Sequence, residues 1–562
     1  MIKIPFLNQS SGPTIRPVVL LVLDGWGSAP PSAGNAISQA RTPNMDNLMR
    51  NYPSGEIIAS GEAVGLPAGE VGNTEVGHLN LGAGRVIYQS FKRINMAIED
   101  GSFFDNPALL SALTNAEQNG KRLHIAGLVS SGNVHSSLEH LMALIKMVKL
   151  KGMGQYTYYH LFTDGRDSNP KDGINIIQNI QKRLMAESAG TIASISGRYY
   201  AMDRDMRWER TKKAYDALVH GIGRQATDPA QAIKSSYQES KTDEFVEPTV
   251  IMREGRPVAT LAEGDSVIIY NFRIDRPRQI TMALTLPDFE RLRSFKLGYD
   301  PTVEKDMGEV PMQTFNRGQH PKSLFVVTMT EYQKGLPVSE VAFPPGVIEA
   351  SLAQVISNAG LKQLHLAESE KERFVTIYFD GLRDAPLPRE DKIIVPSPKV
   401  PTYDQKPEMS VYKLEEEFEK AVKKGGYHFY VMNFANADMV AHSGNLGAAM
   451  RAVEHVDAAL GRVVNAVLAS GGALLVTADH GNAEEMLTFP KNSFFYTSKE
   501  GEMNTDHSAN PVPAVIVRQD FANSHHSLPR GELADIAPTV LALMGLKKPP
   551  QMTGKNLLGW KT

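Results

Sequence analysis

The chain has 562 residues, of which 42% are apolar and 22% charged, a composition typical of a globular protein of several domains. Its 59 basic and 62 acidic residues give a net charge of −3, which argues against a nucleic-acid-binding or membrane-surface protein. The sequence has no cysteine, so disulfides and thiolate metal sites are excluded, and no apolar run approaches the roughly 20 residues that span a bilayer. Because residues 1–17 lack the apolar core of a secretory signal, we expect a soluble, cytoplasmic protein, and we expect it to be a monomer.

The first predicted element is a strand from Val18 to Leu23. Its unbroken apolar run, "VVLLVL", is followed by Asp24 and then by Gly-Trp-Gly. Such a run bounded by glycine favours a strand of a parallel sheet that is buried on both faces. Because ligands bind beyond the carboxyl ends of such strands, Asp24 is a candidate functional residue.

A glycine-rich stretch, "GEVGNTEVGHLNLGAGR", follows from Gly69 to Arg85, with Thr74 in its middle. Glycine permits tight turns and the close approach of a ligand to the backbone. Thr74 has two interpretations: its hydroxyl is a nucleophile, or it caps the helix that we expect to start near Glu75. We expect Glu75 and His78 to be structural parts of that helix.

Four further apolar strands are predicted in the middle of the chain, and polar or charged side chains follow each of them. Arginine binds phosphate and carboxylate through paired hydrogen bonds, although a surface arginine is usually only solvated. We predict that this block is a second α/β domain inserted into the first, and that 292–322, which lacks periodicity, is a loop or the return linker. The side chains after these strands are His135, Asp164, Arg166, Asp167, Arg198, Arg204, Arg273 and Arg276.

The last third of the chain returns to the pattern of the first strand. Apolar runs predict strands near 428–434 and 473–477, and the spacing of apolar residues over 410–426 predicts a helix that ends at a glycine pair. Strands that alternate with helices imply an α/β fold.

Aspartates and histidines follow these last strands. Asp438 and His442 are four residues apart, which places both on one face of a helix, and Asp479 and His480 are adjacent in "TADHGN". Each feature alone has a simpler explanation, since histidine is common on helix surfaces and Asp and Asn favour turns. Together the residues suffice for two divalent metals with nitrogen and oxygen ligands, and Mn²⁺, Mg²⁺ and Zn²⁺ are all compatible. The full set is Asp24, Thr74, Asp438, His442, Asp479, His480 and His507.

Ten motifs occur in one order along the chain, from about Val18 to Pro513. Together they closely resemble the cofactor-independent phosphoglycerate mutases, a family of the alkaline phosphatase superfamily. One motif is modest evidence, whereas ten in order are very specific; 285–325 matches none of them. The motifs are "LVLDGWG", "GNTEVGHLNLGAGR", "GNVHSS", "DGRD", "GRYYAMDRD", "NFRIDR", "AESEK", "SPKVPTYD", "DMVAHSG" and "TADHGN".

The resemblance implies two α/β domains. A phosphatase-like metal-binding domain would comprise 1–88 and 323–562, and a phosphotransferase domain that binds substrate, 89–322, would be inserted into it. One metal would be held by Asp438, His442 and His507, and the other by Asp24, Thr74, Asp479 and His480.

The resemblance also implies an activity, the interconversion of 3-phosphoglycerate and 2-phosphoglycerate in glycolysis and gluconeogenesis. The phosphoryl group would be carried by Thr74, with Asp167 as proton acceptor and donor. Two divalent metals would be needed, with Mn²⁺ expected and Mg²⁺, Zn²⁺ or Co²⁺ compatible, but no 2,3-bisphosphoglycerate. Substrate would be held by His135, Arg166, Asp167, Arg198, Arg204, Arg273, Arg276 and Lys371.

Thr74 departs from the family, whose usual residue at this position is serine. Threonine keeps the hydroxyl but adds a methyl group that restricts χ1. Two alternatives therefore stay open: a metal-dependent phosphatase or phosphodiesterase of the same superfamily, and a catalytically silent homologue. The arginine-rich set of the middle block argues against the first, and the complete set of other metal and substrate residues argues against the second.

Overall fold

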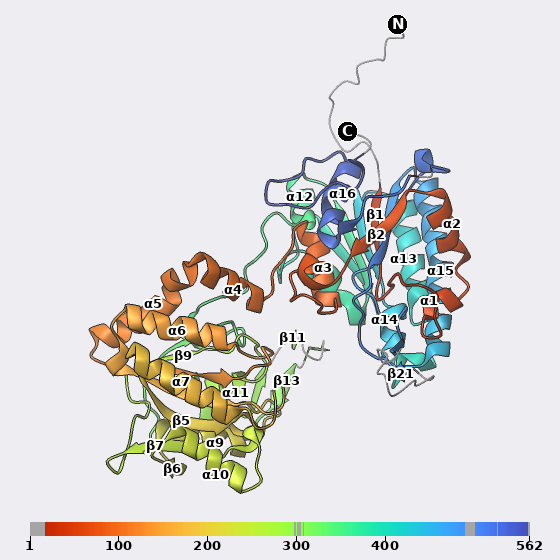
Figure 1. Cartoon of the computed structure of the whole chain (residues 1–562). Helices are drawn as coiled ribbons and strands as arrows, with labels where there is room; N and C mark the ends of the chain where they lie inside the picture. Colours follow the sequence, from red (N-terminus) through yellow and green to blue (C-terminus); the bar gives the residue numbers. More distant parts are fainter. Residues whose placement is uncertain are drawn as a thin grey trace. The chain divides into compact units, whose positions relative to one another are not determined.

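The computed structural model describes residues 17–296, 299–300, 305–306, 308–488, 501–524 and 526–559. Residues 1–16, where no secretory signal is expected, lie outside the described part, as does some of the 292–322 segment. The chain divides into two compact units, unit 1 with Met1–Gln89 and Gly346–Thr562, and unit 2 with Ser90–Pro345 (Figure 1). Within the described ranges, no helix is long and apolar enough to cross a membrane.

Unit 1 is built on a mostly parallel sheet. Over its described residues this sheet has eight strands, in the order β17-β16-β18-β1-β19-β22-β2-β23. β1 pairs in parallel with β18 and β19, whereas β22 runs antiparallel to β19 and β2. The expected α/β class is confirmed. The strands are β1 (Val18–Leu23), β2 (Ser54–Ile58), β16 (Gln363–Glu368), β17 (Glu390–Val395), β18 (Phe429–Phe434), β19 (Ala473–Thr477), β22 (Val512–Arg518) and β23 (Gly531–Glu532).

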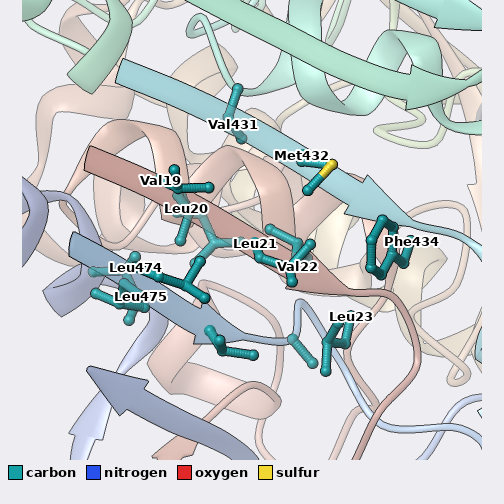
Figure 2. Packing of buried hydrophobic residues seen from close by; sticks show 14 of the residues in the cluster. Val19, Leu20, Leu21, Val22, Leu23, Val431, Met432, Phe434, Leu474 and Leu475 are labelled. Atoms are coloured by element: carbon teal, nitrogen blue, oxygen red, sulfur yellow. The ribbon is translucent and has the colours of Figure 1, made fainter. Parts of the chain in front are cut away.

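β1 lies at the centre of the unit 1 core because its side chains are apolar on both faces. All six residues from Val18 to Leu23 are fully buried. Val431 and Met432 of β18, and Leu474 and Leu475 of β19, belong to the same core cluster (Figure 2). Full burial of such a side chain contributes about 1.5–3 kcal/mol, so this strand anchors the sheet and the loops that leave it.

Helices cover both faces of the unit 1 sheet (Figure 1). The N-cap of the long α15 is Asn445, whose side chain accepts a hydrogen bond from Ala448 N. α13, which corresponds to the helix expected over 410–426, packs beside α15 and has Gly425 as its C-cap. The helices of unit 1 are α1 (Ala36–Gln39), α2 (Pro43–Asn51), α3 (Thr74–Ala83), α12 (Leu352–Asn358), α13 (Val411–Lys424), α14 (Asn436–Ala441), α15 (Leu446–Ala469) and α16 (Ile536–Leu543).

Unit 2 has its own sheet, in the order β15-β14-β9-β3-β4-β5-β7-β6 over the described residues, with β8 paired to β7. β9, β3, β4 and β5 run in parallel, and β7 is antiparallel to β5. The strands are β3 (Leu123–Val129), β4 (Thr157–Thr163), β5 (Thr191–Gly197), β6 (Arg224–Ala226), β7 (Thr249–Arg253), β8 (Arg256–Pro257), β9 (Ser266–Ile269), β14 (Phe325–Thr328) and β15 (Glu340–Val341).

The two faces of this second sheet carry separate cores, because successive residues of a strand point to opposite faces. Leu123, Ile125 and Ile268 belong to one buried cluster, whereas Val267 and Ile269 belong to another. Helices therefore pack on both faces. They are α4 (Ser90–Asp100), α5 (Pro107–Gln118), α6 (Leu138–Leu150), α7 (Gly173–Glu187), α8 (Arg198–Ala201), α9 (Trp208–Val219), α10 (Pro229–Gln238) and α11 (Arg278–Thr285).

The return from unit 2 to unit 1 comes later in the chain than the expected boundary at 322/323. β14 (Phe325–Thr328) pairs in parallel with β9, so it belongs to the unit 2 sheet, and that unit runs to Pro345. The segment 292–322 is also not a simple linker. Its described residues include the antiparallel pairs β10 (Ser294–Lys296) with β13 (Glu309–Pro311) and β11 (Tyr299–Asp300) with β12 (Lys305–Asp306).

Candidate functional site

The first cluster of functional side chains lies at one edge of the unit 1 sheet. β1, β18 and β19 are parallel neighbours, so their carboxyl ends meet at that edge. Asp24 follows β1 and Asp479 follows β19, while Asp438 lies in α14, the helix that begins just after β18. All three carboxylates are fully buried. The topology alone therefore brings together three acidic residues that are far apart in sequence.

Two glycines allow the backbone to pack closely around these carboxylates. Gly25 has φ +70°, and a Cβ there would lie 2.8 Å from the Cα of Asp438. A Cβ on Gly77 of α3 would lie 2.6 Å from the Cβ of Asp479. Both distances are shorter than real contacts, so a larger residue would push the aspartates out of place.

Asp24, Asp479 and His480 form one candidate metal group. Their ligand atoms all lie within 4.8 Å of one another. His480 Nε2 is 3.4 Å from Asp24 Oδ1 and 3.6 Å from Asp479 Oδ2. The Oδ2 atom of Asp479 is buried and receives no hydrogen bond of good geometry. A buried carboxylate oxygen in this state fits a cation, because an unpaired buried charge is costly.

A second candidate group surrounds Asp438. The C-terminal end of α14 places His442 Nε2 3.2 Å from Asp438 Oδ1. His507 Nε2 lies 3.2 Å from His442 Nε2 and 3.5 Å from the same oxygen of Asp438. His480 Nε2, at 3.9 Å from Asp438 Oδ1, joins this group to the first. Nitrogen and oxygen donors of this kind fit Mn²⁺, Zn²⁺ and related divalent ions.

Lys371 lies between the two groups. Its side chain is only 1% exposed, and its Nζ donates to Asp24 Oδ1 at 2.9 Å, Thr74 Oγ1 at 2.9 Å and Asp438 Oδ2 at 2.8 Å. It ends the short 3₁₀ turn Ser369–Lys371 that follows β16. From the sequence, Lys371 was expected among the substrate-binding residues; in the structure it is also the ammonium group inside the carboxylate cluster.

The charges of this cluster perturb the histidines strongly. Burial opposes ionisation of Asp438, but Lys371 and His442 outweigh it and hold the pKa of Asp438 well below its usual value. The Asp438 carboxylate in turn raises the pKa of His442 to about 9. Burial disfavours the charged form of His480, yet Asp479 and the other carboxylates raise its pKa to about 10. Without a metal, the protonated imidazoles and Lys371 balance the buried carboxylates, and a divalent cation would replace those protons.

Thr74 is the first residue of α3, but it does not cap that helix. The N-cap is Asn73, whose side chain accepts from Val76 N at 2.9 Å. Of the two interpretations of Thr74, the one in which its side chain caps the helix is therefore wrong. Its buried hydroxyl instead faces the cluster, with Oγ1 3.0 Å from His480 Nε2 and 2.9 Å from Lys371 Nζ. The position at a helix N-terminus also favours negative charge.

Two polar residues of this site were missed from the sequence. Asn482 donates from Nδ2 to Asp438 Oδ1 at 2.8 Å. The buried carboxylate of Glu484 accepts from the backbone N–H groups of Gly27 at 3.0 Å and Asn482 at 2.9 Å. Glu484 thereby ties the loop after β1 to the loop after β19. Asn482 stands in the "DHGN" motif, which is a signal that was available, whereas nothing in the local spacing marks Glu484.

In unit 2, Arg198 joins several of the residues expected to bind an anion. It begins α8 directly after β5, and it is almost fully buried. Its Nη1 donates to Asp164 and Asp167, and its Nη2 donates to His135 Nε2 at 3.1 Å. Burial lowers the pKa of His135, with Arg198 adding to the effect, so its neutral ring can accept this bond.

Asp275 holds two further arginines. Arg204 Nη1 lies 2.7 Å and Arg273 Nε 3.4 Å from its carboxylate, and both arginine side chains remain 39% exposed. Burial opposes ionisation of Asp275, but His135 and the two arginines outweigh it and lower its pKa. The carboxylate thus orients guanidinium groups that are still accessible to a ligand.

Arg276 and Arg166 differ in how firmly they are held. Burial lowers the pKa of Arg276 to about 10, and the charges of Arg198 and Arg204 contribute. Its Nε is buried without a hydrogen-bond partner. Arg166 is 58% exposed and has a loose contact with Glu244 at 3.5 Å. This concentration of guanidinium groups suits a small molecule with phosphate and carboxylate groups.

Comparison with known proteins shows clear relatives. Residues 94–334 match a protein family described as "BPG-independent PGAM N-terminus". The chain is 47% identical over 543 residues to the 2,3-bisphosphoglycerate-independent phosphoglycerate mutase of Moorella thermoacetica, covering 97% of this chain and 98% of the relative. It is also 47% identical over 544 residues to the protein of the same name from Thermomicrobium roseum, covering 96% and 98%.

Among solved structures, a crystal structure of the phosphoglycerate mutase of Leishmania mexicana at low cobalt concentration is similar to this chain. The TM-score is 0.60 at 29% sequence identity, and the match covers 97% of this chain and 98% of the other. The likeness therefore extends over both units.

Proposed function

Because the chain belongs to the family of 2,3-bisphosphoglycerate-independent phosphoglycerate mutases, we propose that it interconverts 3-phosphoglycerate and 2-phosphoglycerate through a phosphoenzyme on Thr74. In this proposal, unit 1 carries the phosphoryl group and unit 2 recognises the anionic substrate. The step serves glycolysis and gluconeogenesis.

The environment of the Thr74 hydroxyl is the observation that carries the proposal. Asn73 fulfils the capping role, so the helix does not need this hydroxyl. Oγ1 is instead fully buried among His480, Lys371 and Asp24, with the Asp24 oxygen 3.4 Å away. A hydroxyl beside candidate metal ligands and at a helix N-terminus supports the proposed role of Thr74 as the nucleophile.

The clustered carboxylates and imidazoles of unit 1 support a proposal of two divalent cations. We assign one to Asp438, His442 and His507, and the other to Asp24, Thr74, Asp479 and His480, with Mn²⁺ as the expected metal. When bound, such cations supply Lewis-acid stabilisation of phosphoryl oxygens and lower the pKa of hydroxyl groups. Lys371 adds a fixed positive charge within hydrogen-bond distance of the attacking oxygen.

We propose roles for residues of this chain in both halves of the reaction. Thr74 Oγ releases its proton to solvent before the reaction and leaves again as the alkoxide at the end. In the first half, this oxygen bonds to phosphorus, while the bond from phosphorus to the substrate's O3 breaks. The leaving oxygen takes a proton, for which Asp167 is our candidate donor. In the second half, the C2 hydroxyl of the retained glycerate gives up its proton to the same carboxylate and attacks phosphorus, which frees Thr74. The proposed reaction therefore does not use 2,3-bisphosphoglycerate.

The arginines of unit 2 support retention of glycerate between the halves. Arg198 and Asp275 fix the charged network, and Arg204 and Arg273 keep exposed guanidinium groups. A phosphatase has no need to retain its dephosphorylated product, so this set favours a mutase.

Two substitutions at Thr74 test the proposal. Thr74→Val keeps the shape but removes the oxygen, so it should stay folded and lose mutase activity by several orders of magnitude. Thr74→Ser should remain active. Activity is measured as 2-phosphoglycerate formed with Mn²⁺ and without 2,3-bisphosphoglycerate, and the phosphoenzyme is sought by mass spectrometry of protein quenched during turnover.

Thr539→Val is a matched control, because Thr539 is also buried in unit 1, in α16, where its hydroxyl bonds to the Asp535 carbonyl. It should keep the parent rate. A Thr74→Val protein that turns over near the parent rate would show that another residue carries the phosphoryl group. Release of phosphate from 3-phosphoglycerate without 2-phosphoglycerate would indicate a phosphatase instead.

A further inference from the structure

A buried histidine and a buried asparagine lie beside the first metal group, on the side of α3. His78 is one helical turn after Thr74, and Asn433 is the fifth residue of β18; both are fully buried. His78 Nδ1 is 3.0 Å from the carbonyl oxygen of Thr74 and 3.2 Å from Asp479 Oδ2. Asn433 Nδ2 is 3.1 Å from His78 Nε2 and 2.7 Å from Asp24 Oδ2.

These contacts indicate which atoms of His78 and Asn433 donate hydrogen bonds and which accept them. Both neighbours of His78 Nδ1 are oxygen acceptors, so this nitrogen carries the proton and donates to the Thr74 carbonyl. Nε2 then accepts a hydrogen bond from one N–H of the Asn433 amide. The second N–H of that amide donates to Asp24 Oδ2. The Oδ1 of Asn433 is left buried without a hydrogen-bond partner.

The opposite amide orientation is disfavoured by charge. It would place Asn433 Oδ1 against the Asp24 carboxylate and against the acceptor nitrogen of His78. The carboxylate of Asp24 therefore orients the amide, and the amide fixes the tautomer of His78. The ring of Phe374 also lies beside the His78 ring, with the two ring centroids 5.9 Å apart.

The chain of contacts connects three members of one metal group. It runs from Asp479 and the backbone of Thr74 through His78 and Asn433 to Asp24. Each of these members belongs to a different segment, namely the loop after β19, the start of α3 and the loop after β1. Neither His78 nor Asn433 is among the residues that we assign as metal ligands. Any effect of these two residues on metal binding must therefore act through the ligands that they contact.

We propose that His78 and Asn433 are positioning residues that set Asp24, Asp479 and Thr74 in the geometry that binds a divalent cation. The inference rests on the metal assignment made under the proposed function, and it adds a role for His78 beyond the structural part in α3 expected from the sequence. Hydrogen-bonding partners behind metal ligands typically contribute about 10–100-fold to metal affinity. We expect a loss of that size when this chain of contacts is broken.

The test measures Mn²⁺ binding to metal-stripped protein by titration calorimetry at fixed pH. His78→Gln keeps a side-chain acceptor for Asn433 but replaces the fixed ring N–H that faces Thr74 and Asp479 with an amide on a flexible side chain. Asn433→Leu keeps the volume but loses both amide protons. Each should weaken Mn²⁺ binding by about 10–100-fold. Because the two residues act in one chain, the double variant should be weakened by much less than the product of the two single effects.

His140→Gln is the matched control. His140 is a fully buried histidine of α6 in unit 2, and its Nε2 lies 2.8 Å from the side-chain oxygen of Asn95. Its substitution removes a buried imidazole that also faces an asparagine, in a unit that holds none of the assigned metal ligands, so the Mn²⁺ affinity should stay within about twofold of the parent value. Circular dichroism of the metal-free proteins establishes that each variant compared is folded.

The outcomes separate this inference from the proposed function. A parent protein that binds no Mn²⁺ would contradict the metal assignment itself. A parent that binds Mn²⁺, with affinity unchanged in folded His78→Gln or folded Asn433→Leu, would overturn the positioning role and leave the metal assignment intact. Equal weakening in the His140→Gln control would also overturn it, because the loss would then reflect general destabilisation.

Discussion

Replacing Lys371 by methionine would remove a buried positive charge while keeping most of the side chain's volume. The ammonium group lies 2.9 Å from an oxygen of Asp24 and 2.8 Å from an oxygen of Asp438. Without it, the carboxylates of the metal-free protein would lose part of the charge that balances them. We therefore expect a large loss of stability in the metal-free state and a smaller loss when divalent cations are bound.

The size of the effect follows from these distances. At an effective dielectric constant of about 20, each contact corresponds to a gross attraction of about 6 kcal/mol. Desolvating the ammonium group cancels several kcal/mol of that sum, and removal of one partner from a buried ion pair typically costs about 3–5 kcal/mol. That range is our expected loss in the free energy of unfolding without metal. Bound cations would supply the missing charge, so the loss in saturating Mn²⁺ should be smaller.

Urea unfolding followed by circular dichroism, in chelator and in Mn²⁺, measures both losses. Lys392→Met is a suitable control, since Lys392 pairs with Glu372 on the surface and is 56% exposed. An exposed pair of this kind contributes about 0–1 kcal/mol. Equal losses for Lys371→Met with and without Mn²⁺ would refute the reasoning, because they would show that the ammonium group and the cations do not compensate the same carboxylates.

Raising the pH should strengthen Mn²⁺ binding, because imidazole binds metal only when deprotonated and the pKa is about 9 for His442 and about 10 for His480. These pKa values exceed that of an unfolded histidine, so the stabilisation that they give the metal-free protein is complete below about pH 6.5 and is lost as the pH rises through 9 to 10; a pH-independent Mn²⁺ affinity in calorimetry would contradict this assignment. Burial raises the pKa of Glu368 to about 7, so its stabilising effect is lost as the pH rises through 7, and Glu368→Gln should be more stable than the parent by about 2–3 kcal/mol in urea unfolding above pH 8. If Glu368→Gln were no more stable than the parent above pH 8, ionisation of Glu368 would not destabilise the folded protein. Arg198→Met should destabilise unit 2 by about 3–5 kcal/mol and weaken 3-phosphoglycerate binding, since it leaves the buried Asp164 and the partly exposed Asp167 without their cation; unchanged thermal unfolding and unchanged KM would argue against a central role for this arginine.

The central strand and the aspartates beyond it were predictable from local sequence. Val18 to Leu23 is apolar at every position, which is the pattern of a strand covered on both faces, and Asp24 must then lie at the strand's carboxyl end. The same reasoning applies to Asp479 after β19. The four-residue spacing of Asp438 and His442 determines their proximity as soon as a helix forms there.

Other features depend on contacts between segments that are distant in sequence, so the local sequence could not predict them. Asn73 and Thr74 are both good capping residues, and only the exact start of α3 decides between them. The position of Lys371 depends on how β16 pairs with β18, which brings it to Asp24. The late end of unit 2 depends on β14, a strand of four residues whose partner, β9, is far away in sequence.

The interruption of unit 1 by unit 2 sets the order in which the chain can fold while it is being synthesised. β1 leaves the ribosome early, but its partners β18 and β19 begin at Phe429 and Ala473, after the whole of unit 2 has been made. Unit 2 is contiguous, so it can complete its own sheet while the apolar strand β1 still has no neighbours. That delay leaves an aggregation-prone segment waiting for its partners, and it makes the metal-binding cluster one of the last parts of the molecule to assemble, complete only once His507 has been synthesised.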